Sequence, residues 1–416
     1  MDNAGRIFAC TVLSDLITVF RLSATLKAPV HVGRLQAALE AVLPRFPYFA
    51  VQMRRTMFWP CYEPNDQIPR VQADAQSPCQ AFVVRGRGRF PFRVRVFHAR
   101  IAVEFSHAVT DATGAIEFLK SLVAEYLRRG GIELEETHGL MLPGQAPDPE
   151  ECEDAFRKYC QKGLPHPEKR AKAFRLKMPV EPRGVFHITT GIVSLESIRD
   201  CAKQHKASLT ELLAALYLDT LQVHLHQLPP RQQRRRARPI CLDVPVNLRK
   251  MFPSRTLRNF FLPVYLTIDP RLGHYSFDEI LQKVHHSMRA GLDIKELSRQ
   301  ITRNVGAERH PFIRTLPFWV KGQVLSVVYH RLSLRRTTSS LSNLGRVNMP
   351  PALSDAIERF EVVPVFPNAR RVSCGCISFG NRLYITFGRT LTQPTVEQTF
   401  FRKLVALGCP VKIETN

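Results

Sequence analysis

The sequence lacks the long apolar runs of a membrane-spanning protein. Its apolar stretches, such as Leu209 to Leu218, are interrupted by Glu211 and Asp219 well before the roughly 20 residues that a bilayer-spanning helix needs. The chain also begins without a basic region, an apolar run and a small-residue cleavage site, so no secretory signal is expected. These absences predict a protein with no membrane span and, by default, a cytoplasmic location.

Paired cysteines and low-complexity tracts are missing as well. The 10 cysteines are scattered, with no C-x-x-C spacing and no histidines at zinc-finger intervals. We interpret them as free thiols and expect neither a metal nor another bound cofactor. The content of 44% hydrophobic and 23% charged residues is that of a globular chain.

Acidic residues are in short supply: 36 Asp and Glu stand against 59 Lys and Arg, which gives a net charge of +23. A field of this sign attracts nucleic acid, anionic lipid, coenzyme A or an acidic carrier protein. The densest basic run, Arg231 to Arg238, follows two prolines and is predicted to lie on an exposed loop, either merely solvated or docking an anion. No helix-turn-helix, zinc module or mixed aromatic and basic motif accompanies the charge, so nucleic acid is not expected as a partner.

The length of 416 residues favours two domains or lobes. We predict an N-terminal lobe over residues 1–175, a C-terminal lobe over 185–416, and a proline-rich, charged crossover over 140–184. Both halves show mixed periodicity, which indicates an α/β or α+β fold. Strands are expected at 82–84, 91–98, 101–106, 240–245, 260–268, 360–366, 372–379 and 383–387, and helices at 34–43, from 114, from 208, at 277–288 and from 394.

The segment from Ser106 to Gly114 is the strongest candidate for chemistry. His107 ends a strand of alternating pattern, Asp111 follows in a turn, and a helix is predicted from Gly114. A histidine at a strand end can face a cavity while its backbone stays fixed, and neutral imidazole can accept a proton near pH 7. From the residues alone, a catalytic base and a satisfied histidine at a strand end remain equally open. Asp111 is expected to hold the loop shape, paired with an arginine.

A second H-x-x-x-D match, His274 with Asp278, does not share this context. It falls at the start of an amphipathic helix with Ser276 as its expected cap, and we interpret it as coincidence.

The strand, the H-x-x-x-D spacing, the turn and the helix resemble the H-H-x-x-x-D-G signature of the chloramphenicol acetyltransferase-like superfamily. This group includes condensation domains, BAHD acyltransferases and alcohol O-acetyltransferases, and the similarity is strongest to its stand-alone members. Further segments resemble the group in the same order along the chain, namely residues 46–55, 243–249, 258–261 and 342–345.

The resemblance implies two αβ sandwich lobes in a V-shaped arrangement with a tunnel at their junction. It assigns His107 as the general base and Asp111 as the motif aspartate, with Arg54 as the expected partner of Asp111 and Arg55 as the alternative. Ser106 and Ala112 stand where the motif has histidine and glycine. Other residues are implied around the site: Ser342 and Asn343 for substrate binding, and Gly114, Asn247, Arg249 and Asn259 for structural support.

The implied activity is acyl transfer from a thioester to an acceptor hydroxyl or amine, with an acyl-CoA as the donor. The alternative is a condensation enzyme that takes its acyl group from a phosphopantetheinyl thioester on an acidic carrier protein, with the 231–238 run as the dock. The acyl group, the acceptor and the oligomeric state do not follow from the sequence.

Overall fold

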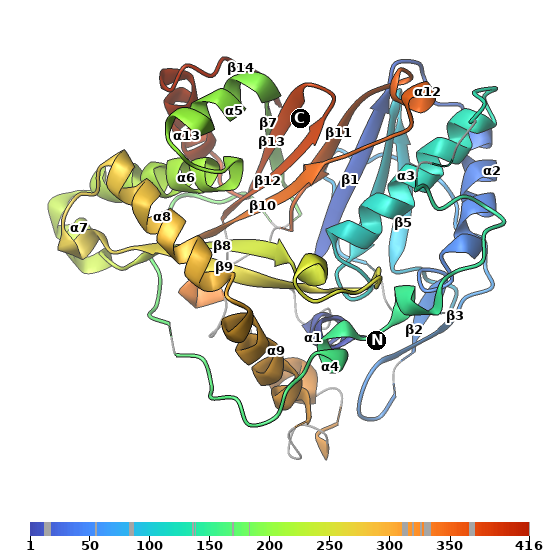
Figure 1. Ribbon diagram of the computed structural model, residues 1–416, viewed down its shortest axis with the longest axis horizontal. Helices are drawn as coiled ribbons and strands as arrows, with labels where there is room; N and C mark the ends of the chain where they lie inside the picture. The colour runs from blue at the N-terminus through green and yellow to red at the C-terminus, as the bar shows by residue number, and fades with distance from the viewer. Residues whose placement is uncertain are drawn as a thin grey trace.

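A computed structural model describes residues 1–11, 18–54, 56–82, 87–134, 137, 139–168, 170–182, 184–309, 315–317, 320–324, 327, 334–365 and 371–415 (Figure 1). Side chains are described for these residues except 10, 11 and 309. The expected strand at 82–84 lies largely outside this part of the chain.

Helices and strands are mixed along the whole described chain. The helices are α1 (Asn3–Thr11), α2 (Val32–Val42), α3 (Ala112–Arg128), α4 (Ala155–Lys158), α5 (Leu195–Gln204), α6 (Leu209–His226), α7 (Pro230–Arg236), α8 (Phe277–Gly291), α9 (Ile294–Arg309), α12 (Pro351–Ser354) and α13 (Thr395–Ala406). The strands are β1 (Val19–Leu26), β2 (Val51–Arg54), β3 (Cys61–Pro64), β4 (Gln72–Ala73), β5 (Phe92–Phe97), β6 (Arg100–Ser106), β7 (His187–Ser194), β8 (Ile240–Asn247), β9 (Phe261–Ile268), β10 (Ser339–Arg346), β11 (Ile357–Val363), β12 (Val372–Phe379), β13 (Arg382–Arg389) and β14 (Val411–Thr415).

The N-terminal lobe is a sheet covered by α2 and α3. Its strand order is β11-β1-β6-β5-β4, and the central strand β6 pairs antiparallel with β1 and β5. The core between sheet and helices is rich in phenylalanine: the ring of Phe118 on α3 contacts the rings of Phe46, Phe49, Phe92 and Phe105. This packing fixes the end of β6, where His107 follows.

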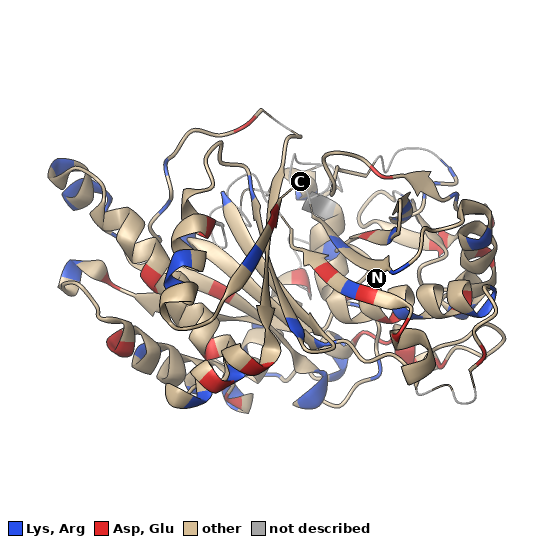
Figure 2. Cartoon of the chain, turned by 90° about the horizontal axis from the view of Figure 1, so that it is seen from above, with Lys and Arg blue, Asp and Glu red and all other residues tan. Residues whose placement is uncertain are grey.

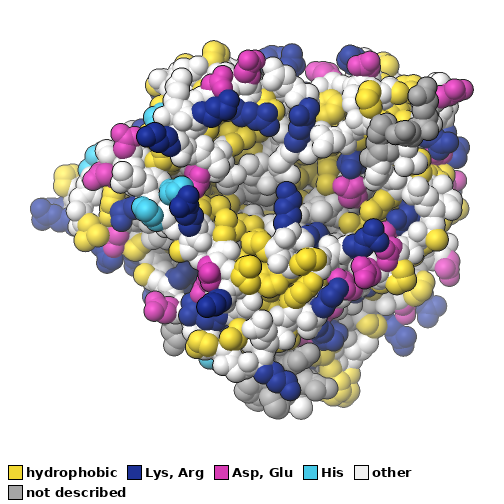
Figure 3. All heavy atoms as spheres, in the orientation of Figure 1, with side chains coloured by type: hydrophobic (Ala, Val, Ile, Leu, Met, Phe, Trp, Pro, Cys, Tyr) yellow, Lys and Arg dark blue, Asp and Glu magenta, His cyan; other side chains and the backbone are white. Residues whose placement is uncertain are grey.

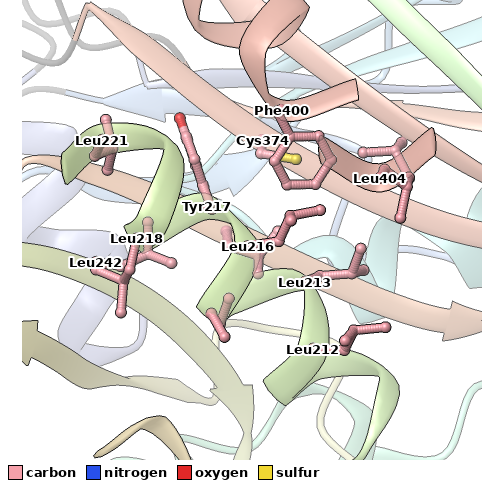
Figure 4. Close-up of a cluster of buried hydrophobic side chains, with 14 of the residues drawn as sticks. Leu212, Leu213, Leu216, Tyr217, Leu218, Leu221, Leu242, Cys374, Phe400 and Leu404 are labelled. Atoms are coloured by element: carbon pink, nitrogen blue, oxygen red, sulfur yellow. The ribbon is translucent and has the colours of Figure 1, made fainter. Parts of the chain in front are cut away.

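The C-terminal lobe is a larger sheet with strand order β14-β7-β13-β12-β10-β8-β9. Helices α6, α8 and α13 cover one face, and their leucines, Tyr217 and Phe400 interdigitate with Leu242 and Cys374 of the sheet (Figure 4). Cys374 and Cys376 are both fully buried in this core, as the alternation of their strand indicates. The opposite face of the sheet is therefore left for contacts with the N-terminal lobe.

Strand β11 links the two lobes. It comes late in the sequence but pairs antiparallel with β1 of the N-terminal sheet, with Arg21 opposite Val363 and Leu26 opposite Ile357. Figure 2 shows the two lobes side by side, with Lys and Arg residues spread over both. The lobe boundaries given above remain predictions.

The α/β class and the two-lobed arrangement predicted from the sequence are confirmed. The helix starts expected at 208 and 277 are confirmed, and each is closed by a capping box, at Ser208–Glu211 and at Ser276–Glu279. The expected loop at 231–238 is wrong in part, because most of it forms the exposed helix α7 after Pro229. Among the described residues, no helix is both long and apolar enough to cross a membrane.

Replacement of Phe118 tests the aromatic core under β6. Phe118 is fully buried, so Phe118→Ala should lower the free energy of unfolding by about 3–5 kcal/mol through lost burial and the cavity left behind. Chemical denaturation measures the change. Leu272→Ala is the control, since Leu272 is 79% exposed and its replacement should change stability by less than about 0.5 kcal/mol. Equal effects of the two substitutions would contradict this description of the core.

Candidate active site

The turn after β6 places His107 between the end of a central strand and the start of a helix. The His107 backbone N–H donates to Thr18 O at 2.9 Å, and the Val109 N–H closes a turn onto Ser106 O at 3.0 Å. Helix α3 then begins at Ala112, two residues before the predicted start, because Asp111 caps it by accepting from the backbone N–H groups of Thr113 and Gly114. The strand and the cap fix the backbone on both sides of His107.

Asp111 also pairs with an arginine, but not with the expected one. Arg249 donates from Nη1 to Asp111 Oδ2 at 2.9 Å and from Nη2 to Oδ1 at 3.2 Å, and the Phe260 N–H donates to Oδ2 at 2.9 Å. The predicted pairing with Arg54 is wrong: the Arg54 side chain is 67% exposed and lies 3.6 Å from Glu63. The alternative, Arg55, lies outside the described residues. The partner therefore comes from the other lobe.

Gly114 is required by a close approach of the lobes. A Cβ atom at this position would lie 2.1 Å from Leu257 O and 2.2 Å from Thr110 Oγ1. The Thr110 hydroxyl donates to the same Leu257 carbonyl at 2.6 Å. The segment between β8 and β9 thus packs directly on the turn that carries His107, and only glycine leaves room for it.

The His107 ring is partly buried among aromatic side chains. Its centroid lies 4.4 Å from that of Phe20, 5.2 Å from that of Phe8 and 5.7 Å from that of Phe261. Desolvation by these surroundings lowers the pKa of His107 below its usual 6.5, although the charge of Asp111 and hydrogen bonds to Asn259 and Thr110 act in the opposite direction. The imidazole is therefore neutral at pH 7 and able to accept a proton.

Asn259 is buried beside His107. Its side-chain Nδ2 donates to the His107 carbonyl at 2.9 Å and to the Asp2 carboxylate at 3.4 Å, while Oδ1 lies 3.4 Å from His107 Nδ1. Asn247, at the end of β8, donates instead to Thr113 Oγ1 at 3.3 Å. Both asparagines connect the lobes, but only Asn259 contacts His107.

Helix α1 is a part of the site that the sequence did not indicate. Phe8 stacks on His107, and a Cβ atom at Gly5 would lie 2.5 Å from Ala108 O. Asn3 donates to Glu308 of α9 at 2.7 Å, and Arg6 also pairs with Glu308. An aspartate before a short helix was the only available signal, since Asp2 accepts from the Gly5 N–H at 2.6 Å. The sequence of α1 gives no indication that this helix contacts His107.

Ser342 and Asn343 lie on β10, where they pair with Gly375 and Cys376 of β12. The Asn343 side chain donates to Thr210 Oγ1 at 3.0 Å and accepts from the Gly345 N–H at 3.0 Å. In the described part of the chain, neither Ser342 nor Asn343 hydrogen-bonds to His107. Their role in substrate binding remains a prediction.

A cleft of about 880 Å³ lies between the lobes, away from His107. It is lined by residues that include Ile357, Tyr384, Arg382 and Lys412. Ile357 pairs with Leu26 at one end of β1, whereas the neighbour of His107, Ser106, pairs with Val19 at the other end. Val19 and Leu26 are seven residue steps apart along the strand, which corresponds to roughly 23 Å. In the view of Figure 3, the surface is hollowed in its upper middle, with basic side chains around the recess.

Comparison with known proteins places the fold in one group. No family model and no curated protein matches the sequence. Polyketide synthase associated protein 5 from Mycobacterium tuberculosis is similar in structure over 96% of both chains, with 15% identity and a TM-score of 0.61. The trichothecene 15-O-acetyltransferase TRI3 from Fusarium sporotrichioides is similar over 98% of this chain and 93% of its own, with 11% identity and a TM-score of 0.62. TRI101 from F. graminearum, complexed with coenzyme A and deoxynivalenol, is similar over 98% of this chain and 96% of its own. Its sequence identity is 13% and its TM-score is 0.58.

These similarities extend over almost the whole chain, so the structure has the chloramphenicol acetyltransferase-like fold that the H-x-x-x-D segment predicted. At this level of identity, the likeness establishes the fold and leaves the activity to be argued from the site.

Replacement of Arg249 tests the pairing of the lobes at Asp111. Both side chains are largely buried, at 10% and 6% exposure, and Arg249 also donates to the carbonyls of Thr256 and Arg258. Arg249→Ala leaves the Asp111 carboxylate buried without its cation and should cost about 3–5 kcal/mol of stability.

Arg54→Ala is the matched control, because its exposed ion pair should contribute less than about 1 kcal/mol. Denaturant unfolding of the two variants measures the difference. A larger loss of unfolding free energy in Arg54→Ala than in Arg249→Ala would refute the pairing of Asp111 with Arg249.

Proposed function

We propose that the protein is an acyltransferase that moves an acyl group from a thioester, with acyl-CoA as the donor, to an acceptor hydroxyl or amine. The proposal rests on His107: its imidazole is partly accessible and fixed where the two lobes meet, and burial lowers its pKa, which favours the neutral form. Fixed position and available basicity are the two requirements of a general base.

In the proposed reaction, the His107 ring accepts the proton of the acceptor O–H or N–H as the acceptor atom forms a bond to the thioester carbonyl carbon. The C–S bond then breaks, and the imidazolium returns the proton to the departing thiolate. Ser342 is a candidate donor to the oxygen that becomes negative in the intermediate. The rings of Phe8, Phe20 and Phe261 cover part of the imidazole and favour an apolar group beside it.

The choice of donor rests on the comparisons and on charge. TRI101 is described in complex with coenzyme A, and a net charge of +23 attracts a phosphate-bearing co-substrate. The alternative donor is an acyl group on an acidic carrier protein. Two observations favour it: the similar protein from M. tuberculosis is associated with a polyketide synthase, and α7 carries exposed arginines at the end of its lobe remote from α1 (Figure 1). The cytoplasmic location remains a prediction.

Replacement of His107 tests the reaction. His107→Ala removes the base and should lower the rate of acyl transfer by about 10²- to 10⁴-fold with folding retained. Product formation is followed by mass spectrometry with a panel of acyl-CoA, carrier-bound and small synthetic thioesters against mixed acceptors.

His274→Ala, at an exposed histidine with the same H-x-x-x-D spacing, should leave the rate unchanged. Undiminished transfer by His107→Ala would exclude the mechanism. Transfer from carrier-bound thioesters only would select the alternative donor.

The acidic limb of the pH profile should report the pKa of His107. Protonation removes the base, so kcat/KM should fall as the pH drops through this pKa, and the midpoint should lie below 6.5 because burial disfavours the charged ring. Burial also raises the pKa of Asp2 to about 6, so the profile is repeated with Asp2→Asn. A limb that persists in Asp2→Asn with its midpoint below 6.5 agrees with the assignment, and a midpoint above 6.5 disagrees with it.

A further inference from the structure

The hydrogen bonds around Asn259 determine how its amide is oriented. Asn259 is 1% exposed, and on one side its amide faces two oxygen atoms, the carbonyl of His107 at 2.9 Å and the carboxylate of Asp2 at 3.4 Å. An amide NH2 only donates and an amide oxygen only accepts. The reversed orientation would bring three oxygens together in a buried place. Nδ2 therefore faces the two oxygens and uses both of its hydrogens there.

This orientation turns Oδ1 of Asn259 toward the imidazole. The distance from Oδ1 to His107 Nδ1 is 3.4 Å. Because Oδ1 has no hydrogen to give, the contact is a hydrogen bond only if Nδ1 carries the proton. A neutral imidazole has a single N–H, so its Nε2 is then left with a free lone pair.

We propose that Asn259 is a positioning residue that holds His107 in the Nδ1–H tautomer and thereby makes Nε2 the atom that receives the proton of the acceptor. The catalytic consequence rests on the acyltransferase function proposed above. The tautomer itself is a property of the resting protein and can be measured without any substrate.

Neither Asp111 nor Asp2, the carboxylates near His107, orients the imidazole directly. Both oxygens of Asp111 are occupied by Arg249 and by the N–H groups of Thr113, Gly114 and Phe260, so Asp111 acts on His107 only through the backbone and its charge. Asp2 acts one step further away, because it holds Nδ2 of Asn259. The Asn259 amide orients the ring, and its hydrogen bond acts to raise the pKa of His107, but desolvation is the larger effect, so the pKa stays below its usual value.

Two features make the arrangement resistant to change. Asp2 is 1% exposed and is held by the Gly5 N–H at 2.6 Å, so the carboxylate that fixes the Asn259 amide cannot turn away while α1 is docked. The carbonyl that accepts the hydrogen bond from Asn259 Nδ2 belongs to His107 itself. One side chain therefore fixes both the backbone and the ring of the same residue, which limits rotation of the imidazole about its side-chain bonds.

The tautomer can be read from ¹⁵N NMR of protein labelled at histidine nitrogens, with His107 assigned by its loss in His107→Gln. In the wild type at a pH where the ring is neutral, Nδ1 should show the shift of a protonated nitrogen and Nε2 that of an unprotonated one. In Asn259→Ala the population should move toward Nε2–H, the form that free histidine prefers. The same substitution should lower kcat about 10- to 100-fold, with a much smaller change in KM.

Asn247→Ala is the matched control. Asn247 also bridges the lobes, through Thr113 at 3.3 Å, and it should leave the His107 tautomer unchanged. A wild-type His107 in the Nε2–H form, or the same tautomer ratio in wild type and Asn259→Ala, overturns the proposal; the wild-type spectrum decides even where a variant does not fold. The expected tautomer together with no transfer from any thioester would leave the assignment of Asn259 intact and refute the acyltransferase function.

Discussion

The Asp111 carboxylate joins the start of α3 in one lobe to the segment before β9 in the other. It accepts from the N–H groups at the helix start, where the helix dipole favours a negative charge, and from Arg249 and the Phe260 N–H across the junction. Burial of a charged pair is costly, and its cost is offset here because every oxygen is hydrogen-bonded. The turn between β6 and α3, and with it His107, has its shape because both lobes hold this one group.

Other contacts at the junction depend on the same alignment. The carbonyl of Leu257 can lie against Gly114 and accept from Thr110 only if the β8–β9 segment is held at the distance that Arg249 sets. Asn259 lies two residues beyond Leu257 and reaches His107 for the same reason. The site is therefore a property of the interface, in which the N-terminal lobe supplies the imidazole and the C-terminal lobe supplies the groups that orient it.

The sequence predicted those features that depend on local patterns. The strand at 101–106, the helix starts at Ser208 and Ser276, and the helical spacing of 34–43 each depend on interactions within a few residues, and the structure confirms them. The alternation in 101–106 did not predict that both faces of this strand are buried. The overall fold was predicted from the resemblance of the H-x-x-x-D segment to the signature of a known superfamily. The start of α3 was expected two residues late because the Asp111 side chain was assigned to an arginine pair and not to a helix cap as well.

Contacts between segments that are distant in the sequence could not be predicted from local sequence patterns. Arg54 was expected as the partner of Asp111, with Arg55 as the alternative, because it follows a helix in the N-terminal lobe. The actual partner, Arg249, depends on how the lobes dock. The role of α1 could not be predicted for the same reason, because nothing in residues 3–11 indicates that Phe8 stacks on the ring of His107, almost 100 positions later. Burial of Asp2 next to Asn259 likewise follows only from the assembled structure.

The dependence of the site on Asp111 and Arg249 is tested most directly by a double-mutant cycle of Asp111→Ala and Arg249→Ala, read as the free energy of unfolding. If the two groups form one buried unit, the double variant should be less destabilised than the sum of the single variants, with a coupling of about 1–3 kcal/mol. Additivity within about 0.5 kcal/mol would mean that the lobes are held together in some other way, and it would contradict the account of how His107 is positioned.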